Sequence, residues 1–219
     1  MKKIAGMFVL FAIGTMGSYS VMASDWKNYR VTVTNATTNH VLTPPLIVIH
    51  NRHFKLFEVA TVASEGLATQ AETGNPSVIA GEANGSRDVY EVVTGDALIH
   101  PGSNVSFDIS APKNADISVT SMLATTNDAF TAISSKTLPK RSVSYMGETY
   151  DAGSEVNNEN CAYIPGPPCA SESGNARATE GAEGFITIHS GIKGRADLSS
   201  ANLDWRGATS IISITRIDN

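Results

Sequence analysis

The chain has 219 residues, a formal net charge of −5 and only two cysteines. An acidic chain without a concentrated basic patch is a poor ligand for nucleic acid or for an anionic membrane surface, so both partner classes are excluded. The densest basic group is Lys136, Lys140 and Arg141, and a solvated loop accounts for it.

The N-terminus has the three parts of a secretory signal peptide. Lys2 and Lys3 precede a predominantly apolar run to Val21, and Ala23 ends the segment. This order predicts a signal peptide over residues 1–23 and a secreted or periplasmic protein. An uncleaved membrane anchor is the alternative, although several glycines dilute the run. The remaining residues 24–219 carry a charge of −7 after the loss of two lysines, and we expect one domain that does not insert into the membrane.

Short stretches of alternating apolar and polar residues follow, with Gly, Asn and Pro between them at intervals of roughly ten residues. The pattern predicts an all-β fold, an antiparallel β-sandwich with one short helix and long loops. The expected strands are residues 29–35, 46–50, 105–109, 117–123, 185–189 and 211–217. Residues 64–70 suit the short helix, with Ser64 as its N-cap. We expect loops over residues 74–85 and 151–184.

The two cysteines, Cys161 and Cys169, flank a proline-rich segment. In an exported chain the simplest interpretation of an isolated pair at this spacing is one disulfide. A redox-active pair is the alternative, but such pairs usually have the tighter Cys-x-x-Cys spacing at a helix start.

Acidic residues occur in two separate turn-like segments. Asp151 and Glu155 flank Gly153, which permits a tight reversal, so both carboxylates can face one point. If Asp128 lies on a neighbouring loop, three carboxylates meet at one end of the sandwich, and their repulsion favours a bound cation. From spacing alone, ordinary turn residues are the preferred interpretation, and the pattern does not match an EF-hand.

Several short motifs occur in a distinctive order: residues 29–35 (YRVTVTN), 43–45 (TPP), 56–59 (LFEV), 121–123 (SML), 127–130 (NDAF), 150–157 (YDAGSEVN), 184–185 (GF) and 204–206 (DWR). In this order the chain resembles the spondin N-terminal domain family, which includes matrix proteins of the F-spondin type and bacterial exported proteins. The resemblance implies a C2-domain-like β-sandwich with a calcium site built from acidic loop residues. It assigns Asp128, Asp151 and Glu155 as the metal ligands. Glu155 departs from the aspartate that animal members usually carry.

The resulting hypothesis is an exported calcium-binding module, not an enzyme, that mediates adhesion to a matrix, a surface glycan or a protein partner. A metal-dependent hydrolase of the cell envelope and a metal-free structural envelope protein are the alternatives. Other candidate sites are weaker: His50 and His53 lack a third zinc ligand, and His189 and Ser190 are strand neighbours that point to opposite faces. Trp26 and Trp205 are assigned to packing or an interface, with sugar stacking as the alternative.

Overall fold

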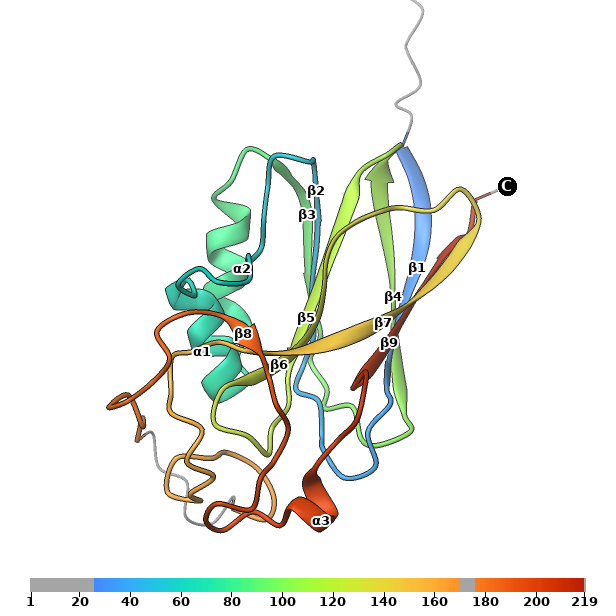
Figure 1. The fold of residues 1–219 in the computed structure, drawn as a ribbon. Coiled ribbons are helices and arrows are strands. Elements are labelled where there is room, and N and C mark those ends of the chain that lie inside the picture. Colours follow the sequence, from blue (N-terminus) through green and yellow to red (C-terminus); the bar gives the residue numbers. More distant parts are fainter. Residues whose placement is uncertain (1–25, 170–175, 219) are drawn as a thin grey trace, which may run out of the picture.

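The computed structural model describes residues 26–169 and 176–218, so the predicted signal peptide lies outside the described residues. The fold is mostly β, with a few short helices (Figure 1). In chain order the elements are β1 (Trp26–Asn35), β2 (Leu46–His50), α1 (Glu65–Thr73), α2 (Ser77–Asn84), β3 (Val89–Thr94), β4 (Asn104–Pro112), β5 (Asp116–Met122), β6 (Ala129–Thr137), β7 (Ser142–Asp151), β8 (Thr187–Ile188), α3 (Ser200–Leu203) and β9 (Ser210–Arg216). No helix in these ranges combines the length and the apolar character needed to cross a bilayer.

All strand pairs are antiparallel, which confirms the predicted sheet type, but the strands form one nearly closed, barrel-like sheet. Their order is β3-β2-β5-β6-β7-β9-β1-β4, with β8 paired to β7. The strand β7 joins the two halves, because its first part pairs with β9 and its last four residues pair with β6. Gly147 lies at this transition, where a Cβ would stand 2.0 Å from the Ser210 hydroxyl oxygen. Only glycine permits so close an approach of the strands.

The open edges of the sheet, β3 and β4, face each other. The amide of Ser110 in β4 donates to Glu91 Oε2 in β3 at 3.0 Å. The rings of Trp26 and Tyr90 meet edge to face nearby, with centroids 6.2 Å apart. The Glu91 side chain thus accepts a hydrogen bond from an edge-strand amide that would otherwise be unpaired.

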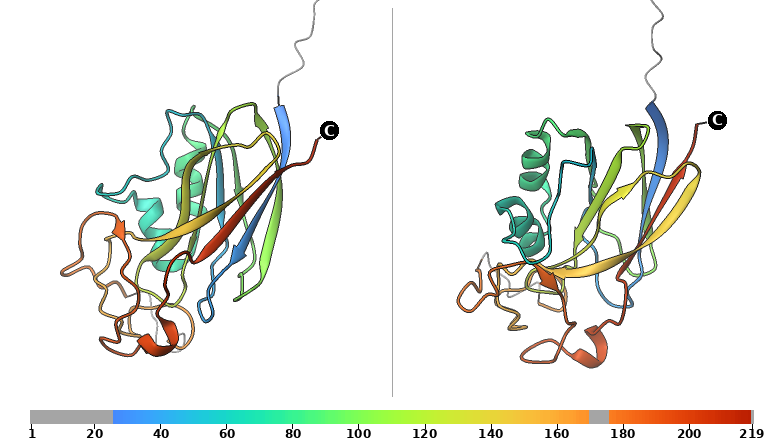
Figure 2. Two further views of the ribbon diagram at one scale, coloured as in Figure 1. Left: turned by 45° about the vertical axis from the view of Figure 1, so that its right-hand side comes forward. Right: turned by 45° about the horizontal axis from the view of Figure 1, so that its top comes forward.

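Apolar side chains fill two main cores. The first lies within the curved sheet and includes Val31, Ile47, Ile49 and Ile214. The second lies between the sheet and the helix pair, which covers one flank in both views of Figure 2, and includes Leu46, Val48, Leu67, Ile79 and Phe130. The strand β2 is therefore buried on both faces, which explains its uninterrupted apolar sequence.

The predicted helix start is confirmed: the Ser64 side chain caps α1 by accepting from the Leu67 amide at 3.1 Å. The predicted loop over residues 74–85 is wrong, because it contains α2. Gly81 and Gly85 suggest a loop locally, but burial of Ile79, Ala80 and Ala83 against the core outweighs that low propensity. The structure therefore has three helices in its described part, where the sequence predicted one.

Candidate functional site

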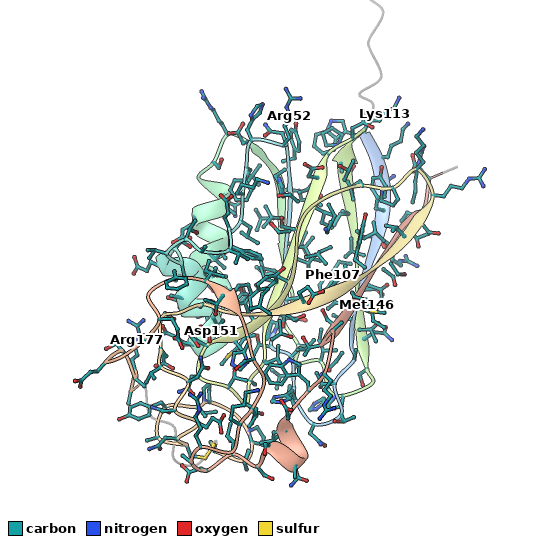
Figure 3. All side chains as sticks on the ribbon, viewed as in Figure 1. Arg52, Phe107, Lys113, Met146, Asp151 and Arg177 are labelled. Atoms are coloured by element: carbon teal, nitrogen blue, oxygen red, sulfur yellow. A yellow bond between two sulfur atoms is a disulfide. The ribbon has the colours of Figure 1, made fainter. Side chains whose placement is uncertain are left out.

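Neighbouring strands bring Asp128 and Asp151 together. Asp128 immediately precedes β6, and Asp151 is the last residue of β7, paired with Ala129. The Ala152 amide donates to the Asp128 carbonyl oxygen at 3.1 Å, which extends this pairing by one step. Figure 3 shows Asp151 at the end of the sheet where the long loops gather, on the side of Arg177.

The segment after Asp151 turns back onto Asp128. Gly153 has φ +68°, a left-handed conformation that glycine adopts without steric cost. The reversal lets the amides of Ser154 and Glu155 donate to Asp128 Oδ2 at 2.8 and 3.0 Å. Asp151 Oδ1 accepts from the Gly153 amide at 2.7 Å, and its Oδ2 accepts from the side-chain amide of Asn157.

Glu155 contributes its backbone amide to Asp128, while its side chain reaches the opposite loop. Its Oε1 accepts from the Ala178 amide at 2.8 Å. In addition to burial, the negative charge of Glu72 raises the pKa of Glu155, and the positive charge of Arg177 lowers it. The same environment buries Glu155 almost completely. The structure thus brings Asp128 and Asp151 into one acidic group and leaves Glu155 at the border between that group and the Ala178 loop.

Burial dominates the electrostatics of all three carboxyls. It raises the pKa of Asp128, and the nearby Asp151 charge raises it further. Burial likewise raises the pKa of Asp151, although the hydrogen bond from Asn157 opposes the shift, and that of Glu155, which rises to about 7. Protonation or a nearby cation would stabilise carboxyl groups that are buried in this way.

Buried carboxylate oxygens without a hydrogen-bond partner indicate whether these residues could hold an ion. Four buried side-chain polar atoms in the described residues lack a hydrogen-bond partner: His40 Nδ1, Asp128 Oδ1, Ser135 Oγ and Glu155 Oε2. Both carboxylate oxygens among them belong to predicted calcium ligands, which fits a hard cation that takes oxygen donors. Within residues 26–169 and 176–218, however, no three His, Cys, Asp or Glu side chains are already arranged as a metal-binding group.

A comparison with known protein families identifies the family of this chain. The model of the spondin N-terminal domain, Spondin_N, matches residues 19–155. The chain belongs to the spondin N-terminal domain family. Members are extracellular adhesion-type modules and are generally not catalytic. No protein in a search of curated sequences matches the chain.

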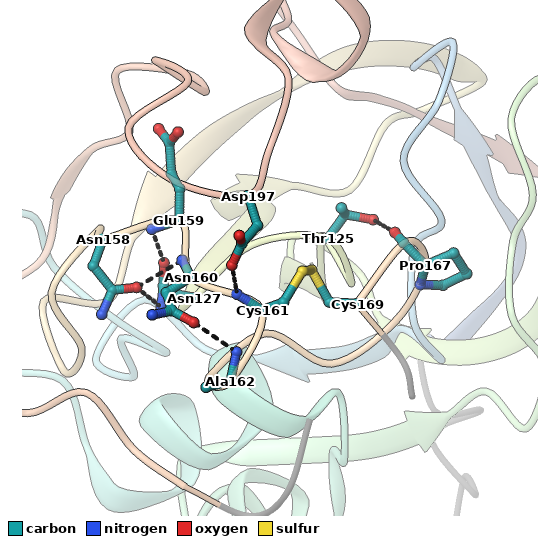
Figure 4. Close-up of a disulfide and its surroundings, with 10 residues drawn as sticks. All are labelled: Thr125, Asn127, Asn158, Glu159, Asn160, Cys161, Ala162, Pro167, Cys169 and Asp197. Carbon is teal, nitrogen blue, oxygen red and sulfur yellow. Dashed lines mark hydrogen bonds between the residues drawn. A yellow bond between two sulfur atoms is a disulfide. The ribbon is translucent and has the colours of Figure 1, made fainter. Parts of the chain in front are cut away.

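The spondin match ends at Glu155, and the chain continues with a disulfide-bonded loop that supports the acidic residues. Cys161 and Cys169 are joined by the predicted disulfide. The loop also bonds to the segment before Asp128, since Thr125 Oγ1 donates to the Pro167 carbonyl oxygen at 2.8 Å and the Glu159 amide donates to Asn127 Oδ1 at 3.2 Å (Figure 4). These contacts hold the segment that leads into Asp128.

Glu159, beyond the end of the spondin match, is a further buried carboxylate, and the sequence analysis missed it. Its Oε1 accepts from the Lys193 amide and its Oε2 from the Arg195 amide, both at 2.6 Å. The Asp197 amide donates to the Glu159 carbonyl oxygen. A glutamate in a polar loop carries no sequence signal for this role, because its partners are backbone amides more than thirty residues away.

The histidine alternatives find structural roles. His50 is buried, with Nε2 hydrogen-bonded to Ser118 Oγ at 2.9 Å and Nδ1 to the Asn51 carbonyl oxygen at 2.8 Å. Trp205 packs between the rings of His40 and His189, with centroid distances of 5.1 and 5.0 Å. We therefore assign no metal to these side chains.

His189 leads to a prediction about acid stability. Burial lowers its pKa to about 4, and the Gly191 amide and the Asn157 side chain occupy its two ring nitrogens. The unfolded chain takes up this proton near pH 6.5, whereas the folded chain resists it down to about pH 4, so stability should fall as the pH drops between these values. Urea unfolding at several pH values should show a smaller acid-induced loss for His189→Gln than for the parent. Equal losses in both proteins would contradict this role.

Proposed function

We propose that this protein is an exported, calcium-binding adhesion module of the spondin type, with a C2-domain-like sandwich as its framework. The observation that supports the proposal best is the pair of buried, unpartnered carboxylate oxygens, Asp128 Oδ1 and Glu155 Oε2. Leaving such oxygens without a partner costs free energy that a divalent cation would offset. Binding would therefore favour the arrangement that these loops already adopt.

The three proposed ligands differ in the hydrogen bonds that their carboxylates make before an ion binds. Asp128 and Glu155 each offer a free oxygen, whereas both oxygens of Asp151 accept hydrogen bonds from Gly153 and Asn157. Each Asp151 oxygen keeps a second lone pair with which it can coordinate the ion, and main-chain carbonyls or water would complete the shell of six to eight oxygens that calcium prefers. A calcium ion would supply positive charge at this point and hold the two loops together.

A binding role is preferred over hydrolysis. A metal-dependent hydrolase needs a base that can take a proton from water beside the ion. Spondin N-terminal domains are generally not catalytic, and His189, the histidine bonded to Asn157, already has a hydrogen-bond partner on both ring nitrogens. We assign the ion a structural and adhesive role, with a secreted or periplasmic location following from the predicted signal peptide.

Isothermal titration calorimetry tests the site directly. We expect one calcium ion per chain with a dissociation constant of about 10⁻⁴–10⁻³ M, the range of extracellular modules. Asp128→Asn should abolish the binding heat, and Asp96→Asn, at an exposed position between β3 and β4, should leave it unchanged. Absence of heat with the parent protein would refute the proposal.

A further inference from the structure

A cavity of about 560 Å³ lies beside the acidic site, between α1 and the loops that flank the disulfide. Its helical wall consists of positions three or four residues apart, which share one face of α1: Glu65, Ala68, Thr69, Glu72 and Thr73. The opposite face of α1 packs against the sheet through Leu67 and Ala71. The volume is within the range of small-molecule and side-chain pockets.

The charges around this cavity favour a cation. Among its described lining residues, three carry carboxylates (Glu65, Glu72 and Glu155) and one, Arg177, carries a guanidinium. The C-terminal end of α1 adds partial negative charge, and its last turn contains no basic residue. The cavity wall therefore has an excess of negative charge.

Three features of the lining residues indicate the chemical class of the ligand. Arg177 forms an ion pair with Glu72, so this wall already binds one guanidinium of the chain itself. Glu155 lines the cavity and is only 1% exposed, and its buried Oε2 has no hydrogen-bond partner. Ala68, Tyr163 and Pro165 offer apolar surface along which an alkyl stem can pack.

We propose that this cavity receives a lysine or arginine side chain of a polypeptide partner, with its cationic head among the carboxylates that line the cavity. This inference rests on the proposed adhesion function and adds the chemistry of the partner. Calcium and the basic side chain both require Glu155, so we expect them to compete. The partner would bind several-fold more weakly when calcium saturates its own site.

Nuclear magnetic resonance titration of the purified ¹⁵N-labelled protein, in chelator, tests the pocket. The probe is N-acetyl-arginine N′-methylamide, and the matched uncharged probe is the norleucine analogue. We expect saturable amide shifts at Ala68, Thr69 and Tyr163 with the arginine probe only. Glu155→Gln keeps an oxygen for the Ala178 amide but loses the charge, so affinity should fall about tenfold or more.

Further variants keep the test decisive if Glu155→Gln does not fold. Glu65→Gln, at an exposed position, should weaken binding about threefold, and Glu58→Gln, exposed and outside the cavity, should have no effect. Equal shifts from the norleucine probe, or no shift at the α1 wall, would overturn the proposal. Binding of spermidine without the arginine probe would overturn it in favour of a free polyamine.

The pocket and the calcium site can fail separately. If calcium raises the melting temperature but the arginine probe does not bind, only the pocket is refuted. If the probe binds in chelator and calcium has no effect on stability, only the calcium site is refuted.

Discussion

Calcium at about 10 mM should raise the melting temperature of this protein by about 3–10 °C relative to chelator. With a dissociation constant of 10⁻⁴–10⁻³ M, that concentration stabilises the folded state by about 1.4–2.7 kcal/mol, and each kcal/mol corresponds to about 2–4 °C for a chain of this size. The physical reason is the acidic group of Asp128 and Asp151, with Glu155 at its border, because burial raises the pKa of all three carboxyls. Differential scanning fluorimetry near neutral pH measures the shift.

Asp151→Asn should remove most of this calcium-dependent increase. Asparagine retains one carbonyl oxygen but no charge, so it offers the ion a weaker ligand than Asp151 does. Magnesium should stabilise less, because it dehydrates reluctantly and requires near-octahedral geometry. Asp96→Asn, at an exposed position between β3 and β4, serves as the matched control. A calcium shift in Asp151→Asn as large as in the parent would refute the site.

Replacing Glu159 with alanine should destabilise the fold by about 3 kcal/mol or more. Each bond from a backbone amide to a charged acceptor contributes about 1.5–3 kcal/mol, and the substitution leaves the Lys193 and Arg195 amides without their partner. With a urea m-value of about 2 kcal/mol/M, the unfolding midpoint should fall by about 1.5 M or more. Urea titration followed by circular dichroism measures the change.

The conservative variant separates charge from geometry at this position. Glu159→Gln keeps one acceptor oxygen but places an amide NH₂ against a backbone N–H, so its loss should be roughly half that of alanine. Glu180→Ala, at an exposed loop position, is the control and should stay within about 0.5 kcal/mol of the parent. An unchanged midpoint in Glu159→Ala would show that the loop from Lys193 to Asp197 is held by other contacts.

The fold class could be predicted because strand formation leaves a local trace. Residues 29–35 alternate in burial as their sequence alternates in polarity, and they lie within β1. The N-cap at Ser64 is local in the same way. In contrast, α2 depends on burial of Ile79 and Ala83 against α1 and the sheet, which no window of the sequence contains.

The acidic site was accessible to sequence analysis only in part. Family motifs identified Asp128, Asp151 and Glu155, and the left-handed turn at Gly153 was anticipated from its flanking carboxylates. The orientation of Glu155 toward Ala178, and the support given by Glu159, depend on chain segments more than twenty residues away. Such long-range hydrogen bonds to backbone amides impose no requirement on the partner's side chain, so they leave no recognisable pattern in the amino-acid sequence.

The sequence by itself determined the antiparallel β character, the disulfide pair and the family. These properties follow from alternation, cysteine spacing and motif order, which are written along the chain. Only the tertiary structure decided that β7 joins both halves of one sheet, that Asp128 and Asp151 lie side by side at the ends of β6 and β7, and that Glu155 borders a cavity. The physical reason is that strand register and loop docking are set by packing and hydrogen bonds between distant segments.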